Sequence, residues 1–243
     1  MIRWTYLFVD HPAPAAGRAA AFWGDVTGTR PSAPWGERGE FTTLSPDGAD
    51  ACLVSQAVGG PGGAHPDFAV EDMAAFTDRA ERLGATTGPT RPELTVMRSP
   101  AGQAFCVVPW RGQRTRPPVL THPGGVRSRL DQLCLDVSPA AFDGEVAFWT
   151  ELTGWDSRPG AHAEFHVLRP PLGVPVRLLV QRLDEPRAVS AHPDLACSDL
   201  AAGRILHERH GAEFVRDGDM WTVMRDPAGG VYCLTGRDPD TGE

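Results

Sequence analysis

An internal duplication constrains this chain more than any other feature. The segment HPDFAVEDMAA, beginning at His65, recurs as HPDLACSDLAA from His192, which lies 127 positions later. TVMRSPAGQAFC, from Thr95, recurs as TVMRDPAGGVYC from Thr222 at the same offset, and AAFWGDVTG around Trp23 matches VAFWTELTG further along. Because these segments keep their order and spacing, the sequence predicts a tandem duplication of one domain.

The two copies are predicted to be domains of ordinary size. We expect the first domain at residues 1–110 and the second at 126–239. The segment between them, 111–125, is rich in proline, glycine and arginine, which favours a linker that runs over the surface.

Each half contains the same alternation of patterns, twice over. Short segments rich in aromatic and branched residues predict strands, and segments with apolar residues at helical spacing predict helices. The first predicted helix of each half ends at Gly28 or Gly154, where a C-cap glycine belongs, and the second begins after Asp72 or Asp199, both good N-caps. The order strand, helix, strands predicts an α+β fold with mixed sheets.

Composition excludes several classes of protein. The chain has 23 Lys and Arg against 31 Asp and Glu, a net charge of −8, and no basic run, so we expect no nucleic acid as partner. Its five cysteines form no CxxC pair, which indicates neither a disulfide framework nor a zinc knuckle. No signal-peptide core and no apolar run of about twenty residues is present, so we expect a cytoplasmic protein that does not bind membranes.

The segments HPDLACSDL, AFWTELTGW, LLVQR and WTVMRDPAGGVYC together resemble the glyoxalase-like branch of the vicinal oxygen chelate superfamily. The resemblance covers both halves and implies four βαβββ modules, paired so that curved mixed sheets enclose cavities. The superfamily includes metal-dependent isomerases, lyases and dioxygenases, enzymes that inactivate drugs, and metal-free proteins that sequester drugs. Fold alone does not choose among these functions.

The resemblance also implies where metal ligands would stand. In metal-dependent members His and Glu ligands come from the first strand of each module and from late strands, with open positions for substrate oxygens. Only one His of the set is retained in each half, and a thiol stands at the final Glu position. The matched pairs are Tyr6 and Gln132, Leu53 and Leu178, His65 and His192, and Cys106 and Cys233. Because two donors hold a divalent ion poorly, we expect no metal and no other cofactor.

Other polar and aromatic residues are candidates for ligand contacts. His162, Glu164 and His166 alternate along the predicted strand AHAEFHV, so they would share one face of it, either solvent-exposed or facing the cavity. The remaining candidates are strand amides and aromatic side chains that suit a flat organic ligand: Gln56, Gln181, Trp155 and Trp221. We expect His207 and His210, near a helix end, to be structural.

The leading prediction is a metal-independent protein that binds a small organic molecule, for sequestration of a drug or metabolite or for secondary-metabolite chemistry. His192, His166 and His65 are the candidate catalytic residues, and the second half is expected to hold the more functional cavity. A metal-dependent lyase, isomerase or dioxygenase that uses His65 or His192 with unrecognised partners is the alternative. A third possibility is a non-catalytic interaction protein. We expect a monomer that forms an internal pseudodimer, or a homodimer.

Overall fold

The computed structural model describes all 243 residues and shows four βαβββ modules, two in each half of the chain. Each module is a strand, a helix and three further strands, so the predicted α+β fold and its duplication are confirmed. No helix combines the length and the apolar character that crossing a bilayer requires.

The first half contains two modules. Their elements are β1 (Ile2–Pro12), a short 3₁₀ turn (Ala13–Ala15), α1 (Ala16–Thr27), β2 (Arg30–Pro31), β3 (Phe41–Ser45) and β4 (Leu53–Val58), then β5 (Gly63–Val70), α2 (Met73–Arg82), β6 (Thr86–Arg91), β7 (Leu94–Arg98) and β8 (Ala104–Pro109). These strands form one sheet in the order β2-β3-β4-β1-β5-β8-β7-β6. The order is an open path from edge to edge, so the sheet does not close into a barrel.

The second half repeats the arrangement. Its elements are β9 (Leu120–Thr121), β10 (Arg127–Val137), α3 (Phe142–Thr153), β11 (Asp156–Pro159), β12 (Phe165–Arg169) and β13 (Arg177–Arg182), then β14 (Ser190–Cys197), α4 (Leu200–Arg209), β15 (Glu213–Asp217), β16 (Trp221–Arg225) and β17 (Val231–Thr235). The sheet order is β11-β12-β13-β10-β14-β17-β16-β15, and β9 pairs with β10. The two halves therefore have the same topology, as the repeat predicts.

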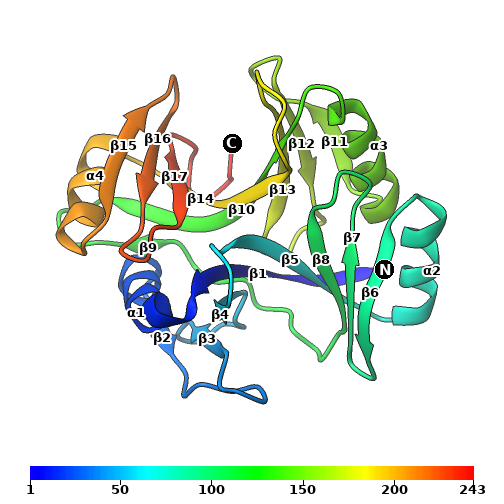
Figure 1. Cartoon of the computed structure of the whole chain (residues 1–243). Helices are drawn as coiled ribbons and strands as arrows, with labels where there is room; N and C mark the ends of the chain where they lie inside the picture. The colour runs from blue at the N-terminus through cyan, green and yellow to red at the C-terminus, as the bar shows by residue number, and fades with distance from the viewer. The chain divides into compact units, whose positions relative to one another are not determined.

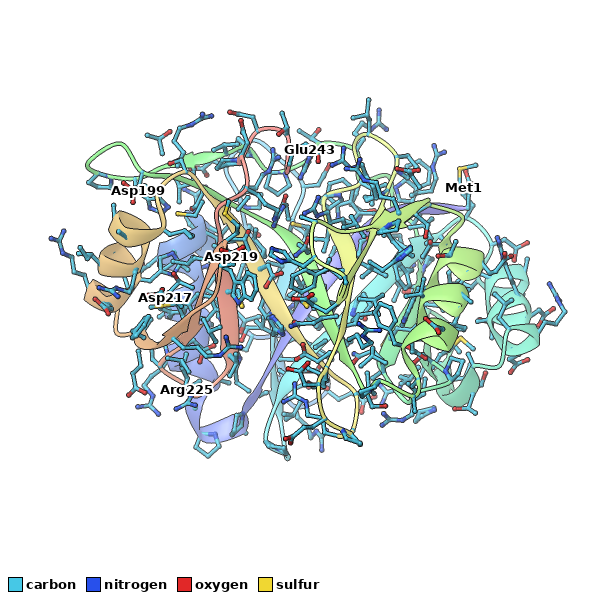
Figure 2. All side chains as sticks on the ribbon, turned by 90° about the horizontal axis from the view of Figure 1, so that it is seen from above. Met1, Asp199, Asp217, Asp219, Arg225 and Glu243 are labelled. Atoms are coloured by element: carbon cyan, nitrogen blue, oxygen red, sulfur yellow. The ribbon has the colours of Figure 1, made fainter.

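The helix ends follow from the predicted capping residues. Gly28 and Gly154 adopt left-handed backbone conformations, with φ of 63° and 65°, and their N–H groups donate to carbonyls in the last turn of α1 and α3. The carboxylates of Asp72 and Asp199 accept the N–H groups of Ala75 and Ala202 at the starts of α2 and α4. Asp199 stands at the beginning of α4 in Figure 2.

The compact units of the chain cut across its two halves. The first unit comprises Met1–Leu7, His65–Thr115 and Leu133–Ala191, and the second comprises Phe8–Ala64, Arg116–Gln132 and His192–Glu243. Each unit thus combines one module from the first half with one from the second. In Figure 1, α2 and α3 lie together in the first unit and α1 and α4 in the second. The boundaries 1–110 and 126–239 stay a prediction.

Aromatic side chains form the contact between modules within each unit. In the first unit Trp149, from α3, is completely buried and meets Phe105 edge to face, with ring centroids 5.3 Å apart. In the second unit Trp23, from α1, meets Tyr232 of β17 at 5.2 Å. Such pairs contribute roughly 0.5–1.5 kcal/mol beyond the apolar area that they bury. Both helix tryptophans, Trp23 and Trp149, are therefore core residues.

Candidate functional site

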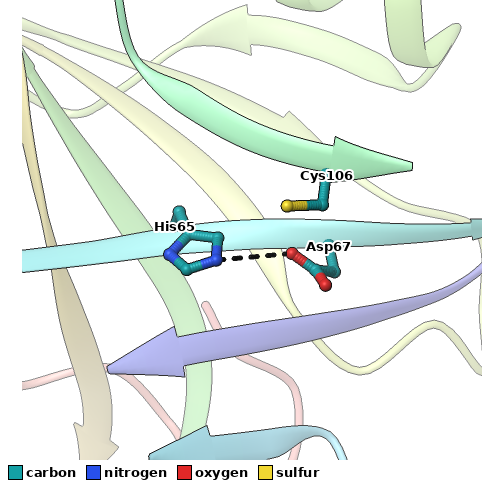
Figure 3. Close-up of side chains that lie close together, drawn as sticks. All are labelled: His65, Asp67 and Cys106. Carbon is teal, nitrogen blue, oxygen red and sulfur yellow. Dashed lines mark ion pairs between the residues drawn. The ribbon is translucent and has the colours of Figure 1, made fainter. Parts of the chain in front are cut away.

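Three polar side chains of the first half converge where β5 and β8 run in parallel. His65 and Asp67 are two residues apart on β5, so both side chains project from the same face of the sheet, and Asp67 is paired in register with Cys106 of β8. The His65 Nε2 atom lies 3.5 Å from Asp67 Oδ1. A nitrogen, an oxygen and a sulfur atom of these residues lie within 4.8 Å of one another. Figure 3 shows the three side chains gathered beside β5.

The second half builds the same cluster. His192 and Asp194 lie on β14, and Asp194 is paired in register with Cys233 of β17. The His192 Nε2 atom lies 3.4 Å from Asp194 Oδ1 and 3.5 Å from Cys233 Sγ. The predicted structural equivalence of the two His residues, and of the two Cys residues, is therefore confirmed. We call these sets the His–Asp–Cys clusters.

Gln132 extends the second cluster. It lies on β10, is almost fully buried, and its side-chain amide donates a hydrogen bond to Asp194 Oδ2. One oxygen of Asp194 is thus held by Gln132 while the other faces His192. Tyr6, at the corresponding position of the first half, lies half-buried on β1.

The side chains of the clusters are mostly buried but remain partly accessible to solvent. The His65 and His192 side chains are 12% exposed, whereas those of Asp67 and Asp194 are 7% and 3% exposed. Each imidazole is therefore the member of its cluster that a ligand can reach. Sequence reasoning named the His and Cys residues but missed both Asp residues, although the HPD triplet gave a signal: a residue two places after a strand His shares its face.

The added carboxylate raises each half from two metal donors to three. Imidazole nitrogen, carboxylate oxygen and thiolate sulfur all bind Zn²⁺, with bonds of roughly 2.0–2.3 Å, which place the donors of a tetrahedral ion roughly 3.3–3.8 Å apart. The separations of 3.4 and 3.5 Å in the second cluster lie in that range. The N···O separation of 3.4 Å also exceeds the roughly 2.7–3.2 Å of a direct N–H···O hydrogen bond, whereas the 3.5 Å between Sγ and Nε2 is also a distance at which sulfur forms hydrogen bonds. The residues present therefore fit a divalent ion with an open coordination position.

The middle-strand positions add no donor. Leu53 and Leu178 are both buried in the core, at 2% and 0% exposure. Any ion would therefore depend on the His–Asp–Cys residues alone among the matched positions.

The predicted polar face of AHAEFHV does not form as expected. β12 begins only at Phe165, because Gly160 N–H donates to the Phe165 carbonyl and Phe165 N–H to the His162 carbonyl, which closes a tight turn. His162 and Glu164 lie in that turn, so placing them along one strand face with His166 was wrong.

His166 takes part in a different network. Its Nε2 lies 2.8 Å from Ser157 Oγ, which lies 2.8 Å from Thr150 Oγ1 on α3. Burial lowers the pKa of the His166 imidazole. His166 therefore connects β12 to β11 and α3 within the first unit.

The other candidates lie at varied depth, Trp155 just before β11 and the rest on strands. Trp155 is buried and meets Phe68 edge to face, with ring centroids 6.1 Å apart, as a core residue does. Gln181, on β13, accepts a weak hydrogen bond from Cys134 Sγ at 3.5 Å. Gln56 on β4 and Trp221 on β16 are half-buried. Their roles as ligand contacts stay predictions.

Comparison with known families and structures agrees with this architecture. A family model described as "Glyoxalase-like domain" matches residues 6–108 and again 132–235. No functionally curated protein matches the chain significantly.

Several solved structures share the fold. The chain is similar to the 2,2′,3-trihydroxybiphenyl 1,2-dioxygenase of dibenzofuran-degrading Sphingomonas wittichii strain RW1, with a TM-score of 0.64, 16% identity, and coverage of 100% of this chain and 95% of that one. It is similar to the 2,3-dioxygenase LapB of Pseudomonas sp. KL28, with a TM-score of 0.63, 13% identity, and coverage of 96% and 92%. A xylose isomerase-like TIM barrel/4-hydroxyphenylpyruvate dioxygenase fusion protein matches with a TM-score of 0.59 and 14% identity over 96% of this chain, which spans only 48% of that protein. At these identities the likeness shows the fold alone.

Proposed function

Because this chain belongs to the glyoxalase-like family, we propose that it binds a small organic molecule at its His–Asp–Cys clusters and acts on it as a lyase or isomerase, with a divalent metal ion held by each cluster. One observation carries the proposal: His192 Nε2 lies 3.4 Å from a carboxylate oxygen and 3.5 Å from a sulfur. The 3.4 Å separation is longer than a direct N–H···O hydrogen bond, and both separations fit donors on one ion. The same three residue types at the same register in the first half support it.

The chain's own residues have distinct tasks in this proposal. His192, Asp194 and Cys233 supply the donors of the second cluster, and His65, Asp67 and Cys106 those of the first. A bound divalent ion supplies Lewis-acid polarisation of a substrate oxygen. Gln132, by donating to Asp194 Oδ2, fixes the carboxylate so that its other oxygen stays toward His192. The partly exposed imidazole edge marks the side from which a substrate enters.

A metal-independent function, the expectation from sequence, is the second candidate. It is supported by the partial exposure of His192 beside the nearly buried Asp194. A carboxylate so placed stabilises a protonated imidazole, which can hold an acidic or phenolic ligand and sequester it.

Metal content separates the two candidates. Protein stripped with a chelator, reloaded with Zn²⁺ and dialysed is expected to retain about two equivalents per chain by elemental analysis. His192→Ala should retain one, and the control His162→Ala, in the turn before β12, should retain two. Acetohydroxamate, which binds metals through two neighbouring oxygens, should then bind the reloaded protein and not the stripped protein. Retention of less than about 0.2 equivalents by the unaltered chain would refute the metal-dependent function and favour sequestration.

A further inference from the structure

The sheet face that carries the second His–Asp–Cys cluster continues outward over β17, β16 and β15, which lie side by side in Figure 1. Cys233 of β17 is paired in register with Val223 of β16, and Val223 with Arg216 of β15. Residues paired in this way project from the same face of a sheet. Arg216 therefore shares a face and a row with Cys233, roughly 10 Å from it at a strand spacing of about 4.8 Å.

Helix α4 covers the opposite face of these strands. Phe214 of β15 lies under the guanidinium of Arg204 from α4, which is 4.8 Å from the centroid of its ring. Its partner on β16, Met224, is completely buried. The row that contains Arg216 is therefore on the face that α4 leaves uncovered.

A bulge in β15 turns Arg216 toward the cluster. Phe214 is paired with Met224 and Arg216 with Val223, so one extra residue, Val215, interrupts the alternation of the strand. Two residues apart on a regular strand, Phe214 and Arg216 would project from the same face and Arg216 would point toward α4. Bulges beside active sites commonly redirect a side chain in this way.

The Arg216 guanidinium is available to a ligand. Arg216 is exposed and forms no ion pair or hydrogen bond within the protein, whereas Arg225, on the same face, is paired with Glu213 at 3.9 Å. The side chain between Arg216 and Cys233 is the apolar Val223. A guanidinium binds a carboxylate through two parallel hydrogen bonds, so this face offers an anion site joined to the cluster by an apolar surface.

The first half has no counterpart of this arginine. Pro89 stands 127 positions before Arg216, between Thr87 and Thr90 of β6, where no residue is paired with β7. The two His–Asp–Cys clusters therefore have the same donors but differ in the charge beside them.

We propose that the second cluster takes a substrate with a carboxylate, which Arg216 binds while the other end of the molecule reaches the ion at His192. An apolar segment between the two ends of the substrate contacts Val223. This substrate class rests on the function proposed for the clusters and adds the specificity of one of them. The first cluster, with Pro89 in place of the arginine, has no preference for an anion.

Two probes that differ in charge test the proposal. One is adipate monohydroxamate, whose hydroxamate binds a metal ion and whose far end is a carboxylate, and the other is its methyl ester. Both are titrated calorimetrically into zinc-loaded His65→Ala, which keeps only the second cluster. The acid should bind about three- to tenfold more tightly than the ester, a modest ratio because the arginine is exposed to solvent. Zinc-loaded His192→Ala, which keeps only the first cluster, should bind both probes equally.

Arg216→Gln, made in the His65→Ala chain, should bind the ester as before and the acid no more tightly than the ester. Arg209→Gln, at an exposed arginine of α4, is the matched control and should keep the preference for the acid. A ratio below about twofold in His65→Ala, a ratio that survives Arg216→Gln, or the same ratio in His192→Ala would overturn the proposal and leave the metal sites intact. Failure of both probes to bind would instead refute the function proposed for the clusters, and this substrate class with it.

Discussion

Asp226 is predicted to be a costly carboxylate to remove from the second unit. It lies in the turn between β16 and β17, is 3% exposed, and its Oδ2 accepts hydrogen bonds from His11 Nε2 at 2.6 Å and Trp23 Nε1 at 3.0 Å. Its Oδ1 accepts the backbone N–H groups of Ala228 and Gly230 at 2.8 and 2.9 Å. One carboxylate therefore connects β1 and α1 of the first half to the last module of the second.

Asp226→Ala removes the acceptor of two buried side-chain donors at once. Leaving a buried donor without its acceptor costs roughly 1–3 kcal/mol, and Asp226→Ala does so for both His11 and Trp23. We therefore expect the free energy of unfolding, measured by urea titration at pH 7 with circular dichroism, to fall by about 3–5 kcal/mol. Asp184→Ala, at an exposed loop position, is the control and should change it by less than about 0.5 kcal/mol.

The pH dependence of stability gives a second test of the contacts of Asp226. Burial alone would raise the pKa of the Asp226 carboxyl, but the hydrogen bond and charge of His11, together with the N–H groups of Gly230 and Trp23, outweigh burial and lower it. A lowered folded-state pKa stabilises the protein fully above the unfolded pKa of about 3.9, and this stabilisation is lost as pH falls through the folded value. The difference in the free energy of unfolding between wild type and Asp226→Ala should thus become smaller below about pH 4. A cost of less than about 1 kcal/mol at pH 7 would refute the reasoning.

Four further predictions follow from other buried or half-buried groups. Tyr232→Phe should destabilise the chain by about 1–3 kcal/mol in urea titration, since it leaves His207 Nδ1, now 2.8 Å from the Tyr232 hydroxyl, without its partner. Burial, with smaller contributions from two nearby histidines, lowers the pKa of His207 to about 3, so only the unfolded chain takes up this proton between about pH 6.5 and 3. The free energy of unfolding should fall as pH drops through that window. His207→Gln should reduce its dependence on pH there, and an unchanged pH dependence would contradict the prediction. Glu145→Ala should cost about 1–3 kcal/mol, because Glu145 accepts Trp149 Nε1 at 2.8 Å and Ala101 N–H at 2.7 Å; a neutral result would show that these bonds do not stabilise the first unit. His166→Ala should retain two zinc equivalents by elemental analysis, since His166 bonds Ser157, whereas a loss of one equivalent would place it in a metal site.

Most of the fold could be predicted from the repeat, because each element had to fit the sequence of both halves. Gly28 and Gly154, or Asp72 and Asp199, were assigned as caps from local chemistry, and local chemistry decides helix ends wherever no tertiary contact competes. The assignment failed at His162 and Glu164, where backbone hydrogen bonds of a tight turn override an alternating pattern that suits a strand equally well.

The pairing of modules into compact units could not be predicted from the sequence. Two copies with the same pattern of elements offer each module two similar partners, so the pattern carries no preference between a partner in its own half and one in the other. The same holds for the clusters: the position of Asp194 opposite Cys233 is a parallel register between β14 and β17, and strand registers across that separation are set by packing. The HPD triplet places the carboxylate on the same face as His192, and the register adds that it lies opposite the thiol of Cys233.

Titration of the stripped protein with Co²⁺ shows whether each His–Asp–Cys cluster binds a divalent ion with its cysteine as a ligand. Cobalt bound by a thiolate gives a sulfur-to-metal charge-transfer band in the near ultraviolet, so the band reports cysteine ligation rather than mere metal uptake. We expect a band that saturates at about two equivalents per chain and at about one in Cys233→Ser or Cys106→Ser, with none in the double variant. Saturation without any thiolate band, or a band of unchanged size in the double variant, would contradict it.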